Sequence, residues 1–405
     1  MSESRRRIPE LDGLRVLMIF IVSWYHIWQQ SWLMPMVGEV SLDFLVRSGY
    51  VWVDGTVLLS AFLLFLPYAA AMRGEAPLPD TRAFYYRRAR RVIPGYYFII
   101  FLVFFAVCLP WELYTNGPYM VKDLATHLTF TFPFFYDTYI ATPLGAASWT
   151  LAIEVQAYVL FPLIARGVVK RPVLTLTLVA LVGWGFRAWC LWGLSEYNMV
   201  VNQLLNFTDV YVIGILGAMA FGPLTRKAEA LRGKKRLLFQ LGATAFFAAA
   251  CFGLIRLLKL QASSMDYAEI QARQMMFRPL YALLFLSLVL SAPIAVKPLR
   301  LLLGNPVTKF LSGVSMNYYL IHQTIIVHMK RIGFPASQTE NPHMSGERPW
   351  QYSYTWWAFG ISLVAAILIT YLIEKPGGKL MDIIRQKIAQ KTEKENLSQK
   401  KQETP

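Results

Sequence analysis

Two ionisable side chains, Arg15 and His26, stand on one apolar stretch, LDGLRVLMIFIVSWYHIW, that runs from residue 11 to 28. Eleven positions at about 100° per residue make about three helical turns, so both side chains share a face, roughly 16 Å apart along the axis. That distance is about half of a ~30 Å hydrocarbon core. If the helix spans a bilayer, His26 lies near the midplane, where an ionisable group is generally kept for function. The alternative is a histidine that only bonds a neighbouring helix.

A second candidate group is the carboxylate of Glu154, which lies with Gln156 inside the apolar stretch SWTLAIEVQAYVLFPL. A carboxylate at this depth needs a positive or hydrogen-bond-donating partner inside the bundle, and the candidates are His26 and Arg15. A carboxylate beside an imidazole fixes its tautomer and so tunes it as a general base. The alternative is a buried hydrogen bond that only joins two helices.

A third candidate group is the arginine cluster of FYYRRARRVIPGYY, residues 84–97, which contains Arg87, Arg88 and Arg91. Arg87 and Arg91 are four positions apart and share a helix face. Guanidinium groups bind phosphates through paired, charge-assisted hydrogen bonds, which predicts a site for a phosphorylated donor. The alternative is a cluster that sets membrane topology and contacts anionic lipid headgroups.

Four further residues are weaker candidates. Asp12 opens the first helix, and Asp54 is expected near the outer end of the second span, facing a water cavity. Ser60 lies deeper in that span, but no Gly-x-Ser-x-Gly elbow surrounds it, so a hydroxyl bonded to its own helix is the alternative to a nucleophile. His322 is at mid-span, six residues from His328, so the two histidines occupy different faces and no metal site is predicted.

The composition predicts an all-α polytopic membrane protein. Of 405 residues, 56% are hydrophobic and only 16% are charged, against about 25% charged in soluble domains. Long apolar runs without alternation favour a helical bundle over a β-barrel. About ten spans are expected, at residues 13–33, 50–71, 92–110, 148–165, 172–193, 206–223, 237–257, 279–296, 308–329 and 354–373.

The basic residues predict the orientation in the membrane. The net charge is +16, and basic loops alternate with loops that are poor in Lys and Arg. The positive-inside rule places both termini and the basic loops in the cytoplasm, in a multi-pass protein of the inner membrane. The expected partner of this charge is the bilayer, not nucleic acid. The connection 258–278, which carries Lys259, Arg273 and Arg278, is the one predicted outer loop that departs from the pattern.

The chain divides into a short cytoplasmic arm, residues 1–10, a membrane domain, residues 11–376, and a charged tail, residues 377–405, expected to be only partly helical. The connection 111–146 is too long for a simple turn and is expected to have a function or local structure of its own.

Six stretches, in this order, resemble the acyltransferase-3 family of integral-membrane O-acyltransferases. They are LDGLR with its Arg-x10-His spacing, VDGTVLLSAF, RRARRVIPGYY, SWTLAIEVQAYVLFPL, YYLIHQ and YLIEKP. The resemblance covers the membrane domain and implies ten core helices. It also implies an acyl-CoA donor, most often acetyl-CoA, and an acceptor hydroxyl on an envelope carbohydrate or a secreted small molecule.

The resemblance further implies that His26 is essential and that Arg15, Arg87, Arg88 and Arg91 matter. On this hypothesis the donor phosphates bind the arginine cluster from the cytoplasm, and His26 acts as general base or briefly carries the acyl group. Arg15 orients a substrate or stabilises charge on the thioester oxygen. The alternative function is a transporter or flippase, which would also carry ionisable residues at the midplane. The absence of paired inverted repeats counts against it.

Overall fold

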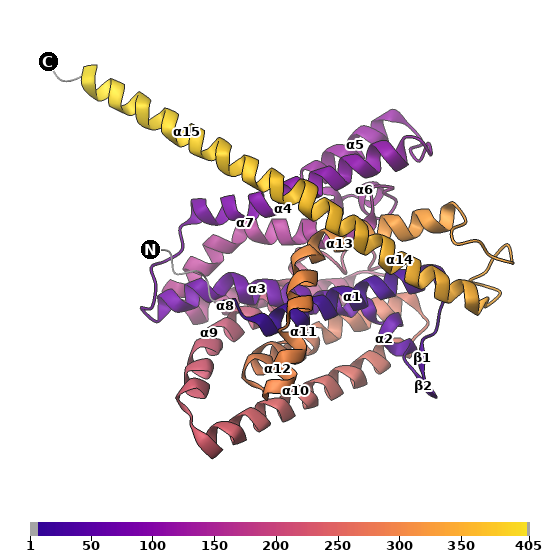
Figure 1. Cartoon of the computed structure of the whole chain (residues 1–405), viewed down its shortest axis with the longest axis horizontal. Coiled ribbons are helices and arrows are strands. Elements are labelled where there is room, and N and C mark those ends of the chain that lie inside the picture. Colours follow the sequence, from indigo (N-terminus) through magenta and orange to yellow (C-terminus); the bar gives the residue numbers. More distant parts are fainter. Residues whose placement is uncertain (1–6, 403–405) are drawn as a thin grey trace.

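The computed structural model describes residues 7–402, most of which are helical (Figure 1). Residues 1–6 of the predicted arm and residues 403–405 of the predicted tail lie outside the described part. The helices are α1 (Pro9–Ser31), α2 (Asp43–Arg47), α3 (Trp52–Met72), α4 (Thr81–Val103), α5 (Gly117–Leu128), α6 (Tyr136–Tyr139), α7 (Trp149–Lys170), α8 (Pro172–Gly193), α9 (Thr208–Ala230), α10 (Gly233–Ala262), α11 (Tyr267–Ser291), α12 (Lys297–Leu303), α13 (Pro306–Arg331), α14 (Arg348–Ile369) and α15 (Lys375–Gln402). A two-stranded antiparallel hairpin joins β1 (Met36–Val37) to β2 (Val40–Ser41).

Each predicted span coincides with a long helix, and this confirms an all-helical polytopic membrane protein. Within the described residues, nine helices are long and apolar enough to cross a bilayer. The predicted span that does not qualify is α13, which buries polar side chains such as Asn317 and His322. Because α13 packs between α1 and α14, protein covers these polar groups and the helix needs less apolar surface than its neighbours.

The ends of α4 and α13 are fixed by local sequence signals. The Asp80 side chain caps α4 by accepting a hydrogen bond from the backbone of Ala83 at 2.5 Å. Asn305 accepts bonds from the backbone N–H groups of Val307 and Thr308 at 2.9 and 3.0 Å, and the Thr308 hydroxyl accepts one from the Asn305 backbone N–H at 3.0 Å. These caps satisfy backbone N–H groups that the first turn of a helix leaves unpaired. They fix the starting residues of α4, which carries the arginine cluster, and of α13, which carries His322.

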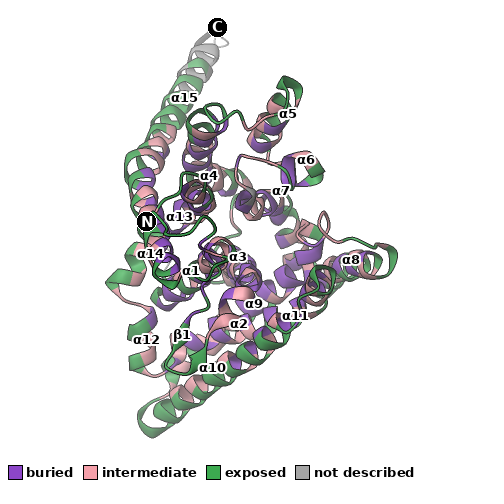
Figure 2. Cartoon of the chain, turned by 90° about the vertical axis from the view of Figure 1, so that its right-hand side faces the viewer, coloured by how far each residue is buried: buried purple, intermediate pink, exposed green. Residues whose placement is uncertain are grey.

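Helix α3 lies at the centre of the bundle and packs most extensively against α9. A methyl group on Gly214 of α9 would lie only 2.9 Å from the Leu58 carbonyl oxygen, so this glycine permits the close approach of the two helices. Figure 2 shows the largely exposed α10 at the edge of the bundle. The outer helices therefore present their apolar faces outward, as lipid-facing helices do.

The C-terminal tail is more helical than the sequence predicts. Helix α14 continues through a π-helical turn, η7 (Thr370–Glu374), into α15, and Figure 1 shows this rod projecting beyond the bundle. Arg90 of α4 binds Asp382 through Nε at 3.0 and 2.9 Å from the two carboxylate oxygens, and the Tyr86 hydroxyl donates to the same residue at 2.8 Å. The prediction of a partly helical tail is wrong for the described residues, because α4 supports the first turns of α15.

The long connection 111–146 carries local structure, in the form of α5 and α6, as expected. Its centre is the buried carboxylate of Asp123, which accepts hydrogen bonds from Tyr114 at 3.0 Å and Thr142 at 2.9 Å and lies 3.1 Å from Nδ1 of His127. At its surface Lys122 donates to both oxygens of Asp137 at 2.8 and 2.7 Å, and these bonds lower the pKa of the Asp137 carboxyl. The connection is therefore a small ordered layer, not a free loop.

Candidate active site

The structure brings His26 of α1 and His322 of α13 together at the middle of the bundle. Their ring centroids lie 5.3 Å apart with the planes inclined by 50°. His26 is half-buried, whereas His322 is completely buried. The three helical turns that follow Arg15 on α1 therefore place His26 next to His322, the mid-span histidine of α13. The sequence offers these two histidines as separate candidates, whereas the structure brings them together as one pair.

The hydrogen bonds around His26 define its tautomer. The amide Nε2 of Gln29 donates to the Tyr25 hydroxyl at 2.9 Å, so its Oε1, 3.0 Å from Nδ1 of His26, faces the ring as an acceptor. With the amide in this orientation, a neutral His26 ring carries its proton on Nδ1 and its lone pair on Nε2. In that form Nε2 can accept a proton from a substrate hydroxyl.

His322 is arranged in the same way. Its Nδ1 donates to the carbonyl oxygen of Tyr319 at 2.6 Å, and its Nε2 is buried without a hydrogen-bond partner in residues 7–402. An unpaired buried acceptor is costly, so a native structure that keeps one generally has a use for it. The backbone N–H of Ala147, which directly follows the connection 111–146, donates to the side chain of Gln323, the residue after His322.

Arg15 lies toward the other end of α1, where α1 meets α13. Its Nη1 lies 3.5 Å from the Ser312 hydroxyl, which donates to Asp12 at 2.9 Å. Asp12 also accepts a bond from Arg7 at 2.7 Å, so this carboxylate holds the helix end and is not free for chemistry. Asp12 is thus a positioning residue for Arg15.

Of the two partners predicted for Glu154, its charge acts on Arg15, together with the charges of Asp12 and Arg91. The side-chain hydrogen-bond partner of His26 is Gln29 instead. The structure therefore gives Glu154 an electrostatic interaction with Arg15 and no hydrogen bond to His26.

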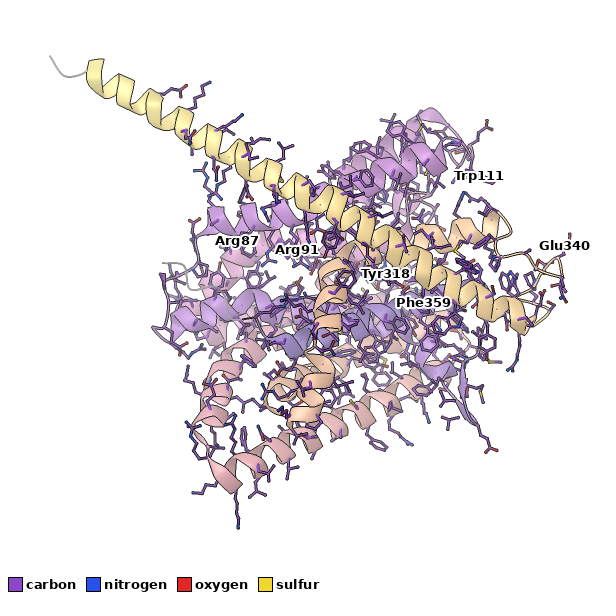
Figure 3. All side chains as sticks on the ribbon, viewed as in Figure 1. Arg87, Arg91, Trp111, Tyr318, Glu340 and Phe359 are labelled. Atoms are coloured by element: carbon purple, nitrogen blue, oxygen red, sulfur yellow. The ribbon has the colours of Figure 1, made fainter. Side chains whose placement is uncertain are left out.

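The arginine cluster divides into free and engaged members. Arg87 and Arg91 are exposed and form no hydrogen bond or ion pair with any residue in the described part of the chain. Arg90, by contrast, is bound to Asp382, and Arg88 lies over the rings of Phe84 and Tyr158 at 5.5 and 5.4 Å. Figure 3 shows Arg87 and Arg91 along α4. Two exposed guanidinium groups on one helix face, without an ion-paired partner among the described residues, can bind an anion.

The expectation that Asp54 faces an outer water cavity is wrong. Asp54 is completely buried and pairs with the completely buried Arg278 of α11, with Nε 3.2 Å from Oδ1. The Arg278 guanidinium lies 3.9 Å from the centre of the Phe207 ring and donates to the Val201 carbonyl at 2.9 Å. Each charge of this buried pair compensates the other, so neither is available to a substrate, and removal of one would leave the other uncompensated.

The same finding corrects the predicted outer loop 258–278. Lys259 belongs to α10, and Arg273 and Arg278 belong to α11, so the connection between the helices is much shorter than predicted. Arg278 is therefore not an exception to the loop pattern, since it lies inside the bundle beside Asp54.

Two other candidates have partners outside the histidine pair. The hydroxyl of Ser60 shares a hydrogen bond with Tyr158, and the Gln156 amide donates to the Phe130 carbonyl at 3.3 Å. This hydrogen bond joins α7 to the connection 111–146. Neither residue has a contact that would make it a nucleophile or a base.

The described residues contain no group of three or more His, Cys, Asp or Glu side chains that could hold a metal ion. The three cysteines are free thiols.

Residues 8–375 match the family model of the acyltransferase-3 domain, described as an acyltransferase domain. The chain belongs to the acyltransferase-3 family. The match covers the membrane bundle from the start of α1 to the first residue of α15. The histidine pair and the free arginines are therefore features of an acyltransferase-3 domain.

Curated proteins that share sequence with this acyltransferase-3 chain have related names. It is 29% identical to a putative peptidoglycan O-acetyltransferase, YrhL, of Bacillus subtilis over 40% of this chain and 24% of that protein. It is 29% identical to the peptidoglycan O-acetyltransferase OatA of Listeria monocytogenes over 46% of this chain and 29% of that protein. It is 30% identical to the O-acetyltransferase OatA of Staphylococcus aureus over 45% of this chain and 29% of that protein. The matches thus span less than a third of each relative. No solved structure matches the chain.

Two features of this acyltransferase-3 domain were missed from the sequence. A charged residue at the end of an apolar run, such as Glu374, ordinarily indicates a membrane boundary, but Asn317 of α13 donates to Glu374 at 2.6 Å and the charge of Arg91 acts on it. A second buried pair joins Arg187 to Asp209 through bonds of 2.7 and 3.0 Å. The signal for both pairs was available, because a charged residue inside an apolar span requires a partner.

Proposed function

We propose that this protein transfers an acyl group, most simply acetyl, from acyl-CoA to a hydroxyl group of a cell-envelope carbohydrate or a related small-molecule acceptor. Membership of the acyltransferase-3 family supports the reaction class. The names of the Listeria and Staphylococcus relatives support acetyl as the group, and the name of the Listeria relative supports an envelope glycan as the acceptor.

The proposal rests on the order in which ionisable side chains follow one another from α4 to the centre of the bundle. Arg87 and Arg91 are exposed and form no ion pair within the described residues, the charge of Arg91 acts on Arg15, and Arg15 shares its α1 face with His26. This order fits a donor with an anionic phosphate end and a reactive thioester end. The phosphates bind the two free guanidinium groups and the thioester approaches the histidine pair.

The side of entry follows from charge. The free arginines lie at the end of the bundle whose loops carry most of the Lys and Arg residues. The positive-inside rule assigns such loops to the cytoplasm, where acyl-CoA is found, and assigns the connection 111–146 to the opposite side. The histidine pair then lies between the donor entrance and an acceptor that approaches from outside.

Nε2 of His26 takes the proton of the acceptor hydroxyl, and the oxygen attacks the thioester carbonyl carbon. A carbon–oxygen bond forms, the carbon–sulfur bond breaks, and the proton passes to the departing thiolate, which leaves as free CoA. Arg15 stabilises the negative charge that develops on the carbonyl oxygen, or orients the donor. A route in which His26 first carries the acyl group uses the same nitrogen and the same leaving thiol.

The proposal is tested with purified protein in detergent, a radiolabelled acetyl-CoA and an envelope glycan. We expect free thiol to appear together with labelled glycan ester. A flippase or transporter would leave the thioester intact while it moves its substrate, so an unchanged thioester in the presence of a range of glycan acceptors would favour that alternative.

A further inference from the structure

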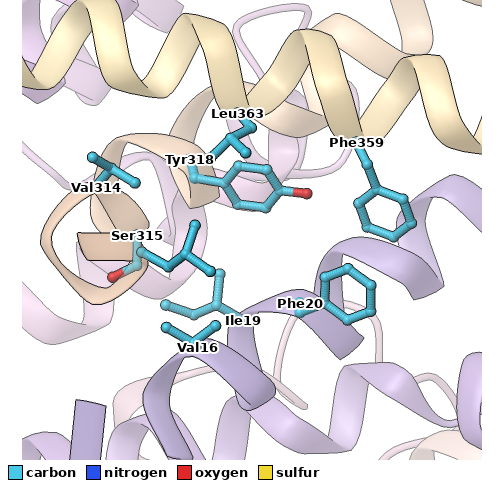
Figure 4. A pocket seen from close by; sticks show the side chains of 9 residues that line it. Val16, Ile19, Phe20, Val314, Ser315, Tyr318, Phe359 and Leu363 are labelled. Atoms are coloured by element: carbon cyan, nitrogen blue, oxygen red, sulfur yellow. The ribbon is translucent and has the colours of Figure 1, made fainter. Parts of the chain in front are cut away.

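An apolar groove lies beside the histidine pair, on the side of the α1–α13 contact that faces α14. Its volume is about 180 Å³, and it is lined by Val16, Ile19, Phe20, Leu311, Val314, Ser315, Tyr318, Phe359 and Leu363. Phe20 and Phe359 stack at 4.6 Å and join α1 to α14 along its edge. Figure 4 shows the Tyr318 ring reaching across the groove.

The groove and the histidine pair lie at successive positions along the contact between α1 and α13. On α1, Ile19, Ser23 and His26 follow at spacings of four and three residues, and so lie on one side of the helix. On α13, Tyr318 and His322 are four residues apart in the same way. The side chains of Ser23 and Tyr318 therefore lie between the groove and the two imidazole rings.

Tyr318 contacts both Ser23 and His322 at this position. Its hydroxyl shares a hydrogen bond of 2.8 Å with Ser23, and its ring is parallel to His322 with centroids 5.8 Å apart. One face of the ring thus contacts the site while the ring also forms a wall of the groove. Tyr318 is the groove-lining side chain that also contacts His322.

We propose that Tyr318 limits the length of the acyl group that the enzyme transfers, an inference that rests on the proposed function. A short acyl group stays on the histidine side of the ring, whereas a longer chain would have to extend into the groove that the ring blocks. The groove is of a useful size, because an apolar cavity of about 150 Å³ holds a six-carbon molecule such as benzene. Its occupant, once the ring is removed, is the alkyl chain of the donor.

The test compares transfer from acetyl-CoA and hexanoyl-CoA by the parent protein, Tyr318→Ala and Tyr318→Leu, each checked for folding by its melting temperature. One methylene in an apolar pocket changes selectivity by about 10–200-fold. We therefore expect the hexanoyl-to-acetyl ratio of kcat/KM to rise at least tenfold in the variants. Binding of the two CoA esters is titrated alongside, and it should shift in the same direction.

Two variants of Leu363, on the far wall, serve as matched controls. Leu363→Ala enlarges the groove behind an intact Tyr318, so it should leave the ratio unchanged. Adding Leu363→Trp to Tyr318→Ala refills the space and should return the ratio toward that of the parent. A general loosening of the site would not respond to this refilling.

The inference is overturned if both folded Tyr318 variants keep the parent preference in turnover and in binding, as they would if only a lipid tail occupied the groove. A parent protein that transfers no acyl group from any CoA ester would overturn the proposed function and this inference with it. An acetyl-transferring parent with unshifted variants would overturn this inference alone.

Discussion

Oε1 of Gln29 lies 3.0 Å from Nδ1 of His26, one turn apart on the same helix, and the Tyr25 hydroxyl fixes the direction of the amide. This contact leaves Nε2 of His26 as the basic nitrogen of the site. The partner predicted from the sequence was a carboxylate on another helix, but the structure supplies a neutral amide from α1 itself. His26 is thus oriented by side chains of its own helix.

Replacing Gln29 by Leu should lower kcat while the KM for the donor stays nearly constant, since the orientation of His26 changes and the arginines do not. A neutral hydrogen bond contributes about 0.5–1.5 kcal/mol, which corresponds to a loss of roughly 2- to 12-fold. Gln29→Glu keeps an acceptor at this position and should restore most of the rate. Steady-state kinetics of both variants decide this, and equal losses in the two would argue against an orienting role.

Replacing Arg87 and Arg91 together by Gln should raise the KM for acyl-CoA, because two charge-assisted contacts with the donor phosphates are lost. Each contact contributes about 1.5–3 kcal/mol. Arg82→Gln is the matched control, since Arg82 is an exposed arginine of the same helix on a different face. An unchanged donor KM in a folded double variant would return Arg87 and Arg91 to a lipid-contacting or topological role.

Asp54→Asn should destabilise the protein without changing the KM for the donor. Breaking a buried ion pair leaves Arg278 uncompensated and costs about 3–5 kcal/mol. Asp43→Asn provides the comparison, because its pair with Arg47 is partly exposed, at 22% and 19% of the two side chains, and such pairs contribute under about 1 kcal/mol. Melting temperatures in detergent measure both, and equal shifts would contradict a special role for the buried pair.

The topology can be tested across α13, the predicted span with the least apolar sequence. In a protein without its native cysteines, a cysteine at Lys235 or Lys297 should react with an impermeant reagent only from the cytoplasmic side. A cysteine at Glu340 should react only from the opposite side. Labelling of positions 297 and 340 from one side would mean that α13 does not cross the membrane.

The sequence predicted the helices well because each crossing needs a long apolar run, which hydropathy detects directly. It predicted the pairing of charged groups poorly. Asp54 and Arg278 are 224 residues apart, and nothing local to either indicates the other. The apposition of His322 to His26 has the same origin, since it depends on how α1 packs along α13. Periodicity shows which face a residue occupies but not which helix that face meets.

Glu374 illustrates a different limit. A charged residue at the end of an apolar run is generally a membrane boundary, and that interpretation fits the sequence. Glu374 lies in the π-helical turn η7, and there its side chain accepts a hydrogen bond from Asn317. A shift of one residue in helical register is not visible in a hydropathy pattern, although such turns are frequent at functional sites.

The central claim is that Nε2 of His26 accepts the proton of the acceptor hydroxyl, and His26→Gln tests it most directly. Gln keeps a hydrogen-bonding group and much of the volume, so the melting temperature in detergent should stay close to that of the parent. His343→Gln, in the connection between α13 and α14, serves as the matched control and should transfer at the parent rate. The measurement is transfer of label from acyl-CoA to the acceptor by the purified proteins.

Loss of a general base should reduce transfer by about 10²–10⁴-fold, and more if His26 also carries the acyl group. A stable His26→Gln protein that transfers at more than about a third of the parent rate, far above the level expected without a general base, would contradict the account and make His26 a packing residue.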